Sequence, residues 1–162
     1  MKCPFCNKKM AAKKDPYHYT ESGLDNVFLH TDVYKCDCGE TIADIPNIYG
    51  LHELIAKALV KKESMLMPKE IKFLRKKMYL KAKELADMLG VTKVTVSRWE
   101  NGAENIGIAN DKLIRFIYAQ MFQEKCKEIV EFIDNVREIN PTARRKRIII
   151  PKKDIKGAVC YF

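Results

Sequence analysis

The sequence contains no uninterrupted run of about 18 apolar residues, the length that a membrane-spanning helix requires. Its opening residues, Met1 to Cys6, also lack the pattern of a secretory signal peptide. We therefore expect a soluble, cytoplasmic protein. Because 47% of the residues are hydrophobic, an ordinary share for a globular chain, wholesale disorder is not expected.

The residue combinations that metalloenzymes use are missing as well. A catalytic zinc site keeps one coordination position open and commonly has a histidine and a nearby glutamate. The chain has 3 histidines but neither a glutamate-bearing zinc helix nor a nucleophile constellation. We expect no enzymatic activity and assign no catalytic residue.

Acidic residues are outnumbered, with 21 Asp and Glu against 30 Lys and Arg, and the net charge of +9 indicates an anionic partner. The excess is unevenly distributed. Residues 1–46 hold six basic and seven acidic side chains, a net of −1, so the remainder carries a net of +10. A nucleic-acid surface is therefore expected after residue 46, and the mildly acidic first part is consistent with a basic protein partner.

Cysteine is present in two close pairs, in a sequence without an export signal, which favours a metal site over disulfides. The predicted zinc ligands are Cys3, Cys6, Cys36 and Cys38. Four thiolates close a tetrahedral site, so the zinc is expected to be structural. Because the second pair is a tight Cys-x-Cys, His30 stays open as a replacement ligand; four unrelated cysteines are the alternative. Cys126 and Cys160 are too isolated for a second site.

Breaks in the pattern divide the chain into four parts. We expect a zinc-binding domain over 1–46, a connecting helix and hinge over 47–67, a helix-turn-helix domain with C-terminal helices over 68–140, and a basic tail over 141–162. Within the first part, the segments 17–20 and 27–34 are rich in aromatic and β-branched residues, which predicts short strands.

Helical spacing recurs through the middle of the chain. Apolar residues between Leu51 and Leu59 predict one helix, and Pro68 suits the first turn of the next. Asn110 is the expected cap of a later helix, with a break near Phe122 and apolar positions continuing at 129, 133 and 136. The helix that starts at Pro68 is expected to turn a basic face to solvent, with phosphate contact as the alternative: Lys69, Lys72, Arg75, Lys76 and Lys77.

The stretch from 81 to 102, KAKELADMLGVTKVTVSRWENG, reads as two short helices joined by a tight turn. Gly90 can adopt the left-handed conformation that ends the first helix, and Thr92 can cap the second. Val91, Val96 and Trp99 are expected to face inward. The pattern is typical of a helix-turn-helix, whose second helix reads the DNA major groove; a plain helical hairpin in a larger core is the alternative.

The outward residues of the second helix are the predicted DNA contacts. Val94 and Thr95 lie four and three positions before Arg98, so the three share one stripe. Arg98 can contact a guanine with two hydrogen bonds, while Val94 or Thr95 can place a methyl group against thymine. Lys93 is better placed for a phosphate, and Glu100 is expected to tie down the following loop. The full predicted DNA-binding set is Thr92, Lys93, Val94, Thr95, Ser97 and Arg98.

The order of the motifs CPFC, KCDCG, LHELIAKAL, PKEIKFLRKKM and GVTKVTVSRWENG resembles the MqsA/YgiT-type zinc-finger and helix-turn-helix proteins. The similarity covers roughly residues 1–120. It implies zinc on the four cysteines, a DNA-reading helix over 92–101, an operator in the protein's own promoter, and in antitoxin members a toxin held by the N-terminal segment. Lys81 and Ala82 depart from the family pattern, which often has a Ser/Thr cap followed by a phosphate-binding Gln.

These observations give one leading hypothesis and two competitors. The expected fold class is α+β, a small zinc-stabilised β-rich domain followed by an all-α, lambda-repressor-like domain. The expected function is a sequence-specific DNA-binding repressor, an antitoxin that binds its own promoter and a toxin, acting as a twofold dimer. A zinc-dependent protein adaptor and a zinc hydrolase are the competitors. The run from Arg144 to Arg147 is either a solvated tail or a basic arm on DNA phosphates.

Overall fold

The structure is a computed structural model that describes residues 1–122, 142–144 and 146–157. The helical positions expected at 129, 133 and 136, and the isolated Cys126 and Cys160, lie outside the described residues. In the part that is described, every helix is too short or too polar to cross a membrane.

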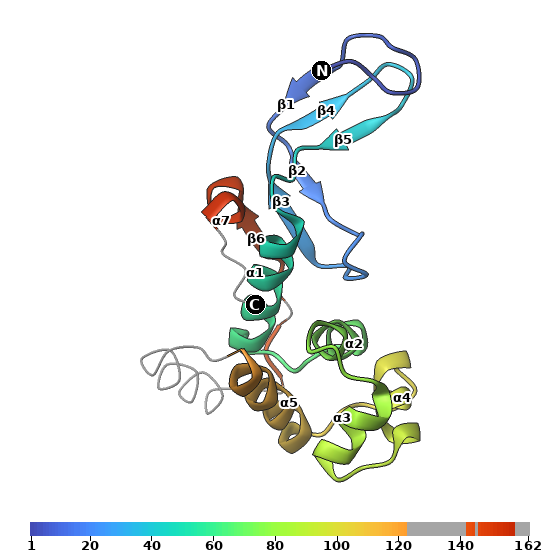
Figure 1. Cartoon of the computed structure of the whole chain (residues 1–162), viewed down its shortest axis with the longest axis vertical. Helices are drawn as coiled ribbons and strands as arrows, with labels where there is room; N and C mark the ends of the chain where they lie inside the picture. Colours follow the sequence, from blue (N-terminus) through green and yellow to red (C-terminus); the bar gives the residue numbers. More distant parts are fainter. Residues whose placement is uncertain (123–141, 145, 158–162) are drawn as a thin grey trace.

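The cysteine-bearing end is a small antiparallel sheet of three strands in the order β1-β4-β5 (Figure 1). The strands are β1 (Ala11–Lys13), β4 (Val33–Lys35) and β5 (Thr41–Ala43). This end has its own minimal core of Cys3, Met10 and Cys36, against which Tyr34 and Ile42 pack. So little apolar surface cannot stabilise a fold alone, which makes a metal ion the expected source of stability.

A second three-stranded sheet connects this end to the helices, in the order β2-β3-β6. It contains β2 (Pro16–His18), β3 (Val27–His30) and, from the far end of the chain, β6 (Ile148–Pro151). β3 pairs with β2 antiparallel and with β6 parallel, and Phe28 lies opposite Ile149. The basic tail therefore contains a paired strand, which neither sequence interpretation of this segment expected.

Six helices complete the described structure (Figure 1). α1 (Ile48–Lys61) begins at Asn47, whose side chain accepts a hydrogen bond from the Gly50 amide, and buries Leu51, Ile55 and Leu59. The others are α2 (Pro68–Lys77), α3 (Ala82–Leu89), α4 (Lys93–Asn101), α5 (Ile108–Met121) and α7 (Lys152–Gly157). One hydrophobic core joins these helices to β3 and β6. The fold is α+β, a β-rich cysteine-bearing part followed by a helical part, as the sequence predicted.

The hinge between α1 and α2 is clamped by a buried ion pair on α5. Arg115 and Asp111 have fully buried side chains with the Arg115 Nε–Asp111 Oδ1 distance at 2.7 Å. Arg115 also donates to the carbonyl oxygens of Val60, Lys62 and Ser64, and Asp111 accepts from the Leu66 amide. A buried arginine needs such a full set of acceptors, so this hinge has a defined conformation.

Two local predictions were wrong. α5 begins at Ile108 after Gly107, so Asn110 lies inside the first turn and does not cap the helix. On α2, Arg75 and Lys77 do not face solvent, because Arg75 pairs with Glu100 and Lys77 pairs with Glu53, all with side chains less than a fifth exposed. A charged side chain with a fixed partner can be buried at a position that its spacing assigns to the surface.

Candidate metal centre and nucleic-acid interface

Two tight turns carry the four predicted zinc ligands. In the first, the Cys3 amide donates to the Lys8 carbonyl and the Asn7 amide donates to the Cys3 carbonyl, both at 2.9 Å. In the second, the Cys36 amide donates to the Glu40 carbonyl and the Gly39 amide to the Cys36 carbonyl. Asn7 and Gly39 have φ values of 60° and 95°, the left-handed region that reverses the chain sharply.

The sulfur atoms of Cys3, Cys6, Cys36 and Cys38 all lie within 4.8 Å of one another. The Cys3–Cys38 and Cys6–Cys36 sulfur distances are 3.6 and 3.3 Å. Ligands at about 2.3 Å on a tetrahedral zinc ion would lie about 3.8 Å apart, close to this spacing. A hydrogen bond from the backbone amide of Cys6 is the main cause that lowers the pKa of Cys3 to about 7, whereas the pKa values of the other three thiols are raised, so the fit to a metal rests on the spacing of the sulfur atoms. The four cysteines therefore fit a metal ion that is coordinated by four thiolates.

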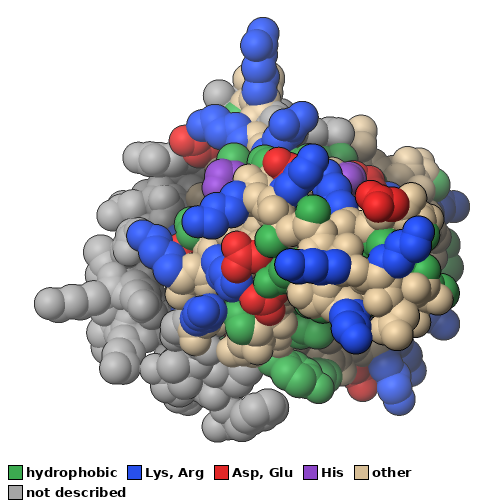
Figure 2. Space-filling model, turned by 90° about the horizontal axis from the view of Figure 1, so that it is seen from above, with side chains coloured by type: hydrophobic (Ala, Val, Ile, Leu, Met, Phe, Trp, Pro, Cys, Tyr) green, Lys and Arg blue, Asp and Glu red, His purple; other side chains and the backbone are tan. Residues whose placement is uncertain are grey.

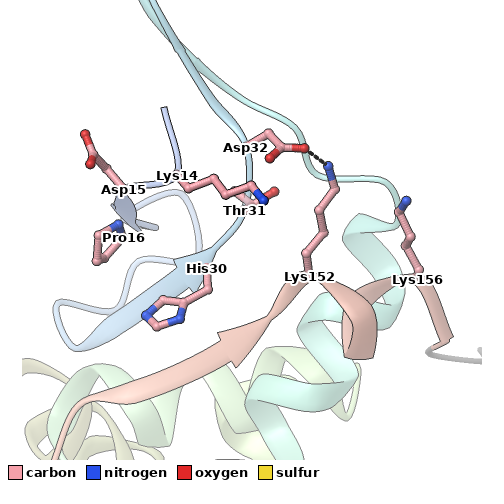
Figure 3. Close-up of a pocket in the computed structure, with 8 residues that line it drawn as sticks. All are labelled: Lys14, Asp15, Pro16, His30, Thr31, Asp32, Lys152 and Lys156. Carbon is pink, nitrogen blue, oxygen red and sulfur yellow. Dashed lines mark hydrogen bonds and ion pairs between the residues drawn. The ribbon is translucent and has the colours of Figure 1, made fainter. Parts of the chain in front are cut away.

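His30 lies apart from the cysteine cluster. It lines a cavity of about 530 Å³ between the β2–β3 hairpin and α7, together with Lys14, Asp32 and residues of the C-terminal segment (Figure 3). Within the described residues, the only group of side chains that could hold a metal consists of the four cysteines. The geometry thus favours the cysteine set over the alternative in which His30 replaces one of them.

The cavity is closed on one side by ion pairs that hold the C-terminal segment against the N-terminal half. Lys152 contacts the carboxylates of Asp32 and Asp44 at 2.5 and 2.6 Å, and Figure 3 shows the first of these contacts. This hydrogen bond from Lys152 lowers the pKa of Asp32, with smaller contributions from Lys14 and Lys156. Because the charges around Asp32 largely neutralise one another, we interpret this cluster as structural: it holds the C-terminal segment in place and does not bind a ligand.

The helix-turn-helix has the caps that its sequence predicts. Gly90 ends α3 with φ 65°, and its amide bonds the carbonyls of Ala86 and Asp87. The Thr92 hydroxyl accepts from the Thr95 amide at 3.1 Å and so caps α4. Gly102 ends α4 with φ 75°, a left-handed conformation that favours glycine, although a Cβ there would make only an ordinary contact with the Pro68 ring at 3.4 Å.

The faces of α4 are divided as expected. Val96 and Trp99 are buried in the common core, and Val91 packs against it. Lys93 and Ser97 are exposed, and Val94 and Arg98 are 60% and 61% exposed. Thr95 is half-buried, and its hydroxyl lies 2.9 Å from that of Thr92. The outward face of α4 is therefore short, polar and cationic, with one exposed apolar residue.

The role predicted for Glu100, near the end of α4, was wrong. Glu100 does not tie down the following loop; it forms two hydrogen bonds with the guanidinium of Arg75 on α2. The residue that lies near the reading face is Glu104, 3.9 Å from Arg98. Helical spacing assigned Arg75 to the solvent-facing side of its helix and could not show that it meets Glu100, since the two residues lie on different helices.

The chain thus combines a β module whose four cysteines could hold a metal ion with a helix-turn-helix. The model of one family, the antitoxin component of the bacterial toxin–antitoxin system MqsA, matches residues 1–129. The chain belongs to this MqsA antitoxin family. A search of curated proteins found no match to the chain. The strand β6 and helix α7 lie beyond the matched residues.

Proposed function

We propose that this antitoxin is a sequence-specific DNA-binding repressor that acts in the cytoplasm on its own promoter. The observation that carries the proposal is the exposed face of α4, where Lys93, Val94 and Arg98 point away from a core that holds Val96 and Trp99. A helix anchored in this way can enter a major groove while the helix before it crosses the backbone.

The roles within the interface follow from side-chain chemistry. The Arg98 guanidinium has the planar pair of donors that matches the two acceptors on guanine. The exposed Val94 methyl groups suit a thymine methyl, and the half-buried Thr95 contributes at most its methyl group because its hydroxyl is engaged at the helix cap. Lys93 supplies a phosphate contact that sets the register without reading sequence. Such domains bind as twofold dimers on half-sites about one helical turn apart.

The ion at the cysteine cluster is proposed to be Zn²⁺ with a structural role. Removing it should unfold the β1–β4–β5 end and leave the helices folded, because the two parts have separate cores. The test is to compare metal content and amide hydrogen exchange of the wild type and Cys6→Ser. Stoichiometric zinc in the wild type, with protection lost only at residues 1–13 and 33–43 in the variant, is the expected result. A metal-free wild type with full protection would contradict a structural metal.

The toxin is proposed to bind the N-terminal half, because the helix-turn-helix face is reserved for DNA. Family membership supports a toxin partner. The acidic net charge of residues 1–46, however, does not support a basic toxin. Four of its acidic residues already form ion pairs within the chain: Asp15, Asp25, Asp32 and Asp44. Shape and the exposed edges of the sheets are the features left for toxin recognition.

Two experiments test the proposal. A gel shift with the DNA upstream of the protein's own gene, in excess non-specific DNA, should give a discrete complex. Co-expression with the product of the neighbouring small open reading frame should rescue growth and yield a co-purifying pair. A chain that co-purifies with a partner but never shifts its upstream DNA would favour the adaptor function, with the helix-turn-helix used for docking.

A further inference from the structure

Basic and acidic residues are unevenly distributed within residues 1–46, although their net charge is close to zero. The first 14 residues contain five lysines and no acidic residue, and all five lysines are exposed. Of the seven acidic residues that follow up to residue 46, four are neutralised by ion pairs, two of them with the distant Lys152 and one with Lys69. Seen from the cysteine end, Lys and Arg side chains are spread over the surface with fewer Asp and Glu among them (Figure 2).

Three of these lysines flank the first cysteine loop. Lys2 and Lys9 face each other across an isolated antiparallel bridge, and Lys8 precedes Lys9. Like charges directly opposite in such a pair are destabilising. None of the three forms an ion pair with another described residue. The two unpaired acidic residues of this end, Asp37 and Glu40, belong to the second loop.

The first cysteine loop also presents an unusually exposed aromatic ring. Phe5 lies between two cysteines of the cluster and is 80% exposed, more than any other large hydrophobic side chain of the described residues. The loop that carries it is closed by the hydrogen bonds between Cys3 and Lys8 and between Asn7 and Cys3. A rigid loop holds the ring out at little conformational cost, so the ring is preorganised for contact with a planar group.

We propose that this loop, defined by Lys2, Phe5, Lys8 and Lys9, is a binding site for single-stranded nucleic acid. A base stacks on Phe5, and the lysines contact the phosphates on either side. Aromatic rings among lysines are the combination that binds single strands without sequence preference, because every base has a stacking face. A duplex offers the lysines phosphates but keeps its bases stacked internally, so Phe5 has no partner there. The site is separate from the reading face of α4 and does not depend on it.

The test is fluorescence polarisation of the full-length protein with a labelled 12-nucleotide single strand, as RNA and as DNA of the same sequence. Phe5→Ala removes the ring, and the triple variant Lys2→Gln, Lys8→Gln, Lys9→Gln removes the charges. Tyr49→Ala is the matched control for the ring, since Tyr49 is 68% exposed at the start of α1. Lys153→Gln, exposed on α7, is the control for charge. Binding of operator duplex reports on folding of the variants.

Phe5→Ala should weaken single-strand binding about tenfold while leaving the salt dependence unchanged, because a neutral stacking contact releases no counterions. The triple variant should lower the slope of log affinity against log salt by about 2. The two controls should bind like the wild type, and the relative affinity for RNA and DNA identifies the natural strand. Equal affinity of Phe5→Ala and wild type for the single strand would overturn the proposal. Displacement of the strand by poly-glutamate at matched charge would also overturn it, and would indicate an acidic protein partner instead.

Discussion

Arg75 of α2 and Glu100 of α4 form a two-pronged ion pair, with Nε–Oε1 at 2.5 Å and Nη2–Oε2 at 2.9 Å. Arg75 also donates to the carbonyl of Leu80, at the turn into α3. One guanidinium therefore links α2 to α4 and to the turn before α3. The Arg75–Glu100 pair fixes the angle between α2 and α4.

Glu100→Ala should be strongly destabilising, by about 3 kcal/mol, because it leaves the largely buried charge of Arg75 without a partner. Denaturant unfolding measures the change. Glu63→Ala is the matched control, since Glu63 and Lys146 form a pair that is 64% and 80% exposed and should contribute no more than about 0.5 kcal/mol. Equal effects of the two substitutions would show that the Arg75–Glu100 pair does not hold the unit together.

The C-terminal strand can be tested by two neighbouring isoleucines. Ile150 is 6% exposed in the common core, whereas Ile149 is 53% exposed on the other face of β6. Ile150→Ala should lower the free energy of unfolding by about 3 kcal/mol through lost burial and a cavity, while Ile149→Ala should change it by about 0.5 kcal/mol or less. A solvated tail would give two small and equal effects in the same denaturation experiment.

Tyr79 occupies a strained backbone position at the end of α2. Its φ is 58° and its side chain is 77% exposed, so little packing offsets the left-handed conformation. Tyr79→Gly should raise the unfolding free energy by about 1 kcal/mol, because glycine adopts this conformation without a steric penalty. Tyr79→Ala is the control, since it removes the ring but keeps Cβ and should not gain this stability. An unstable glycine variant would show that the tyrosine ring stabilises the turn.

His52 should make stability dependent on pH. Burial lowers its pKa, and the nearby Lys77 lowers it further; the ring bonds the Tyr19 hydroxyl at 2.9 Å. The unfolded chain then binds a proton that the folded chain does not, so stability is lost as pH falls from about 6.5 through the folded-state pKa. His52→Gln should reduce the difference between urea midpoints at pH 7.5 and 5.5, and the same substitution at exposed His30 is the control. An unchanged difference in His52→Gln would place the acid sensitivity elsewhere.

Structural features that depend on residues close together in the chain were predicted correctly from the sequence. The left-handed Gly90, the Thr92 cap and the buried Val96 and Trp99 are consequences of residues a few positions apart, and the structure has all of them. The spacing of the cysteines likewise predicted that their four sulfurs would converge.

What the sequence did not reveal are the long-range partners. The run of isoleucines in β6 pairs with β3 more than 100 residues earlier, and no local pattern distinguishes such a strand from an exposed tail. Arg115 and Asp111 read as ordinary surface charges of a helix, yet both are fully buried because the hinge carbonyls face them. The net charge of residues 1–46 was misleading for the same reason, since its acidic side chains pair with Lys69 and Lys152.

The proposed function depends on the reading role of Arg98, and the most direct measurement of that role is the ratio of affinities for operator and non-specific DNA across a range of salt concentrations. For Arg98→Ala we expect this ratio to fall about tenfold or more, since a bidentate contact to guanine discriminates by about 1–3 kcal/mol. Lys93→Ala should instead weaken both affinities alike and reduce the salt slope by about 1. An Arg98→Ala protein that keeps the wild-type ratio would contradict the assignment of α4 as the helix that reads sequence.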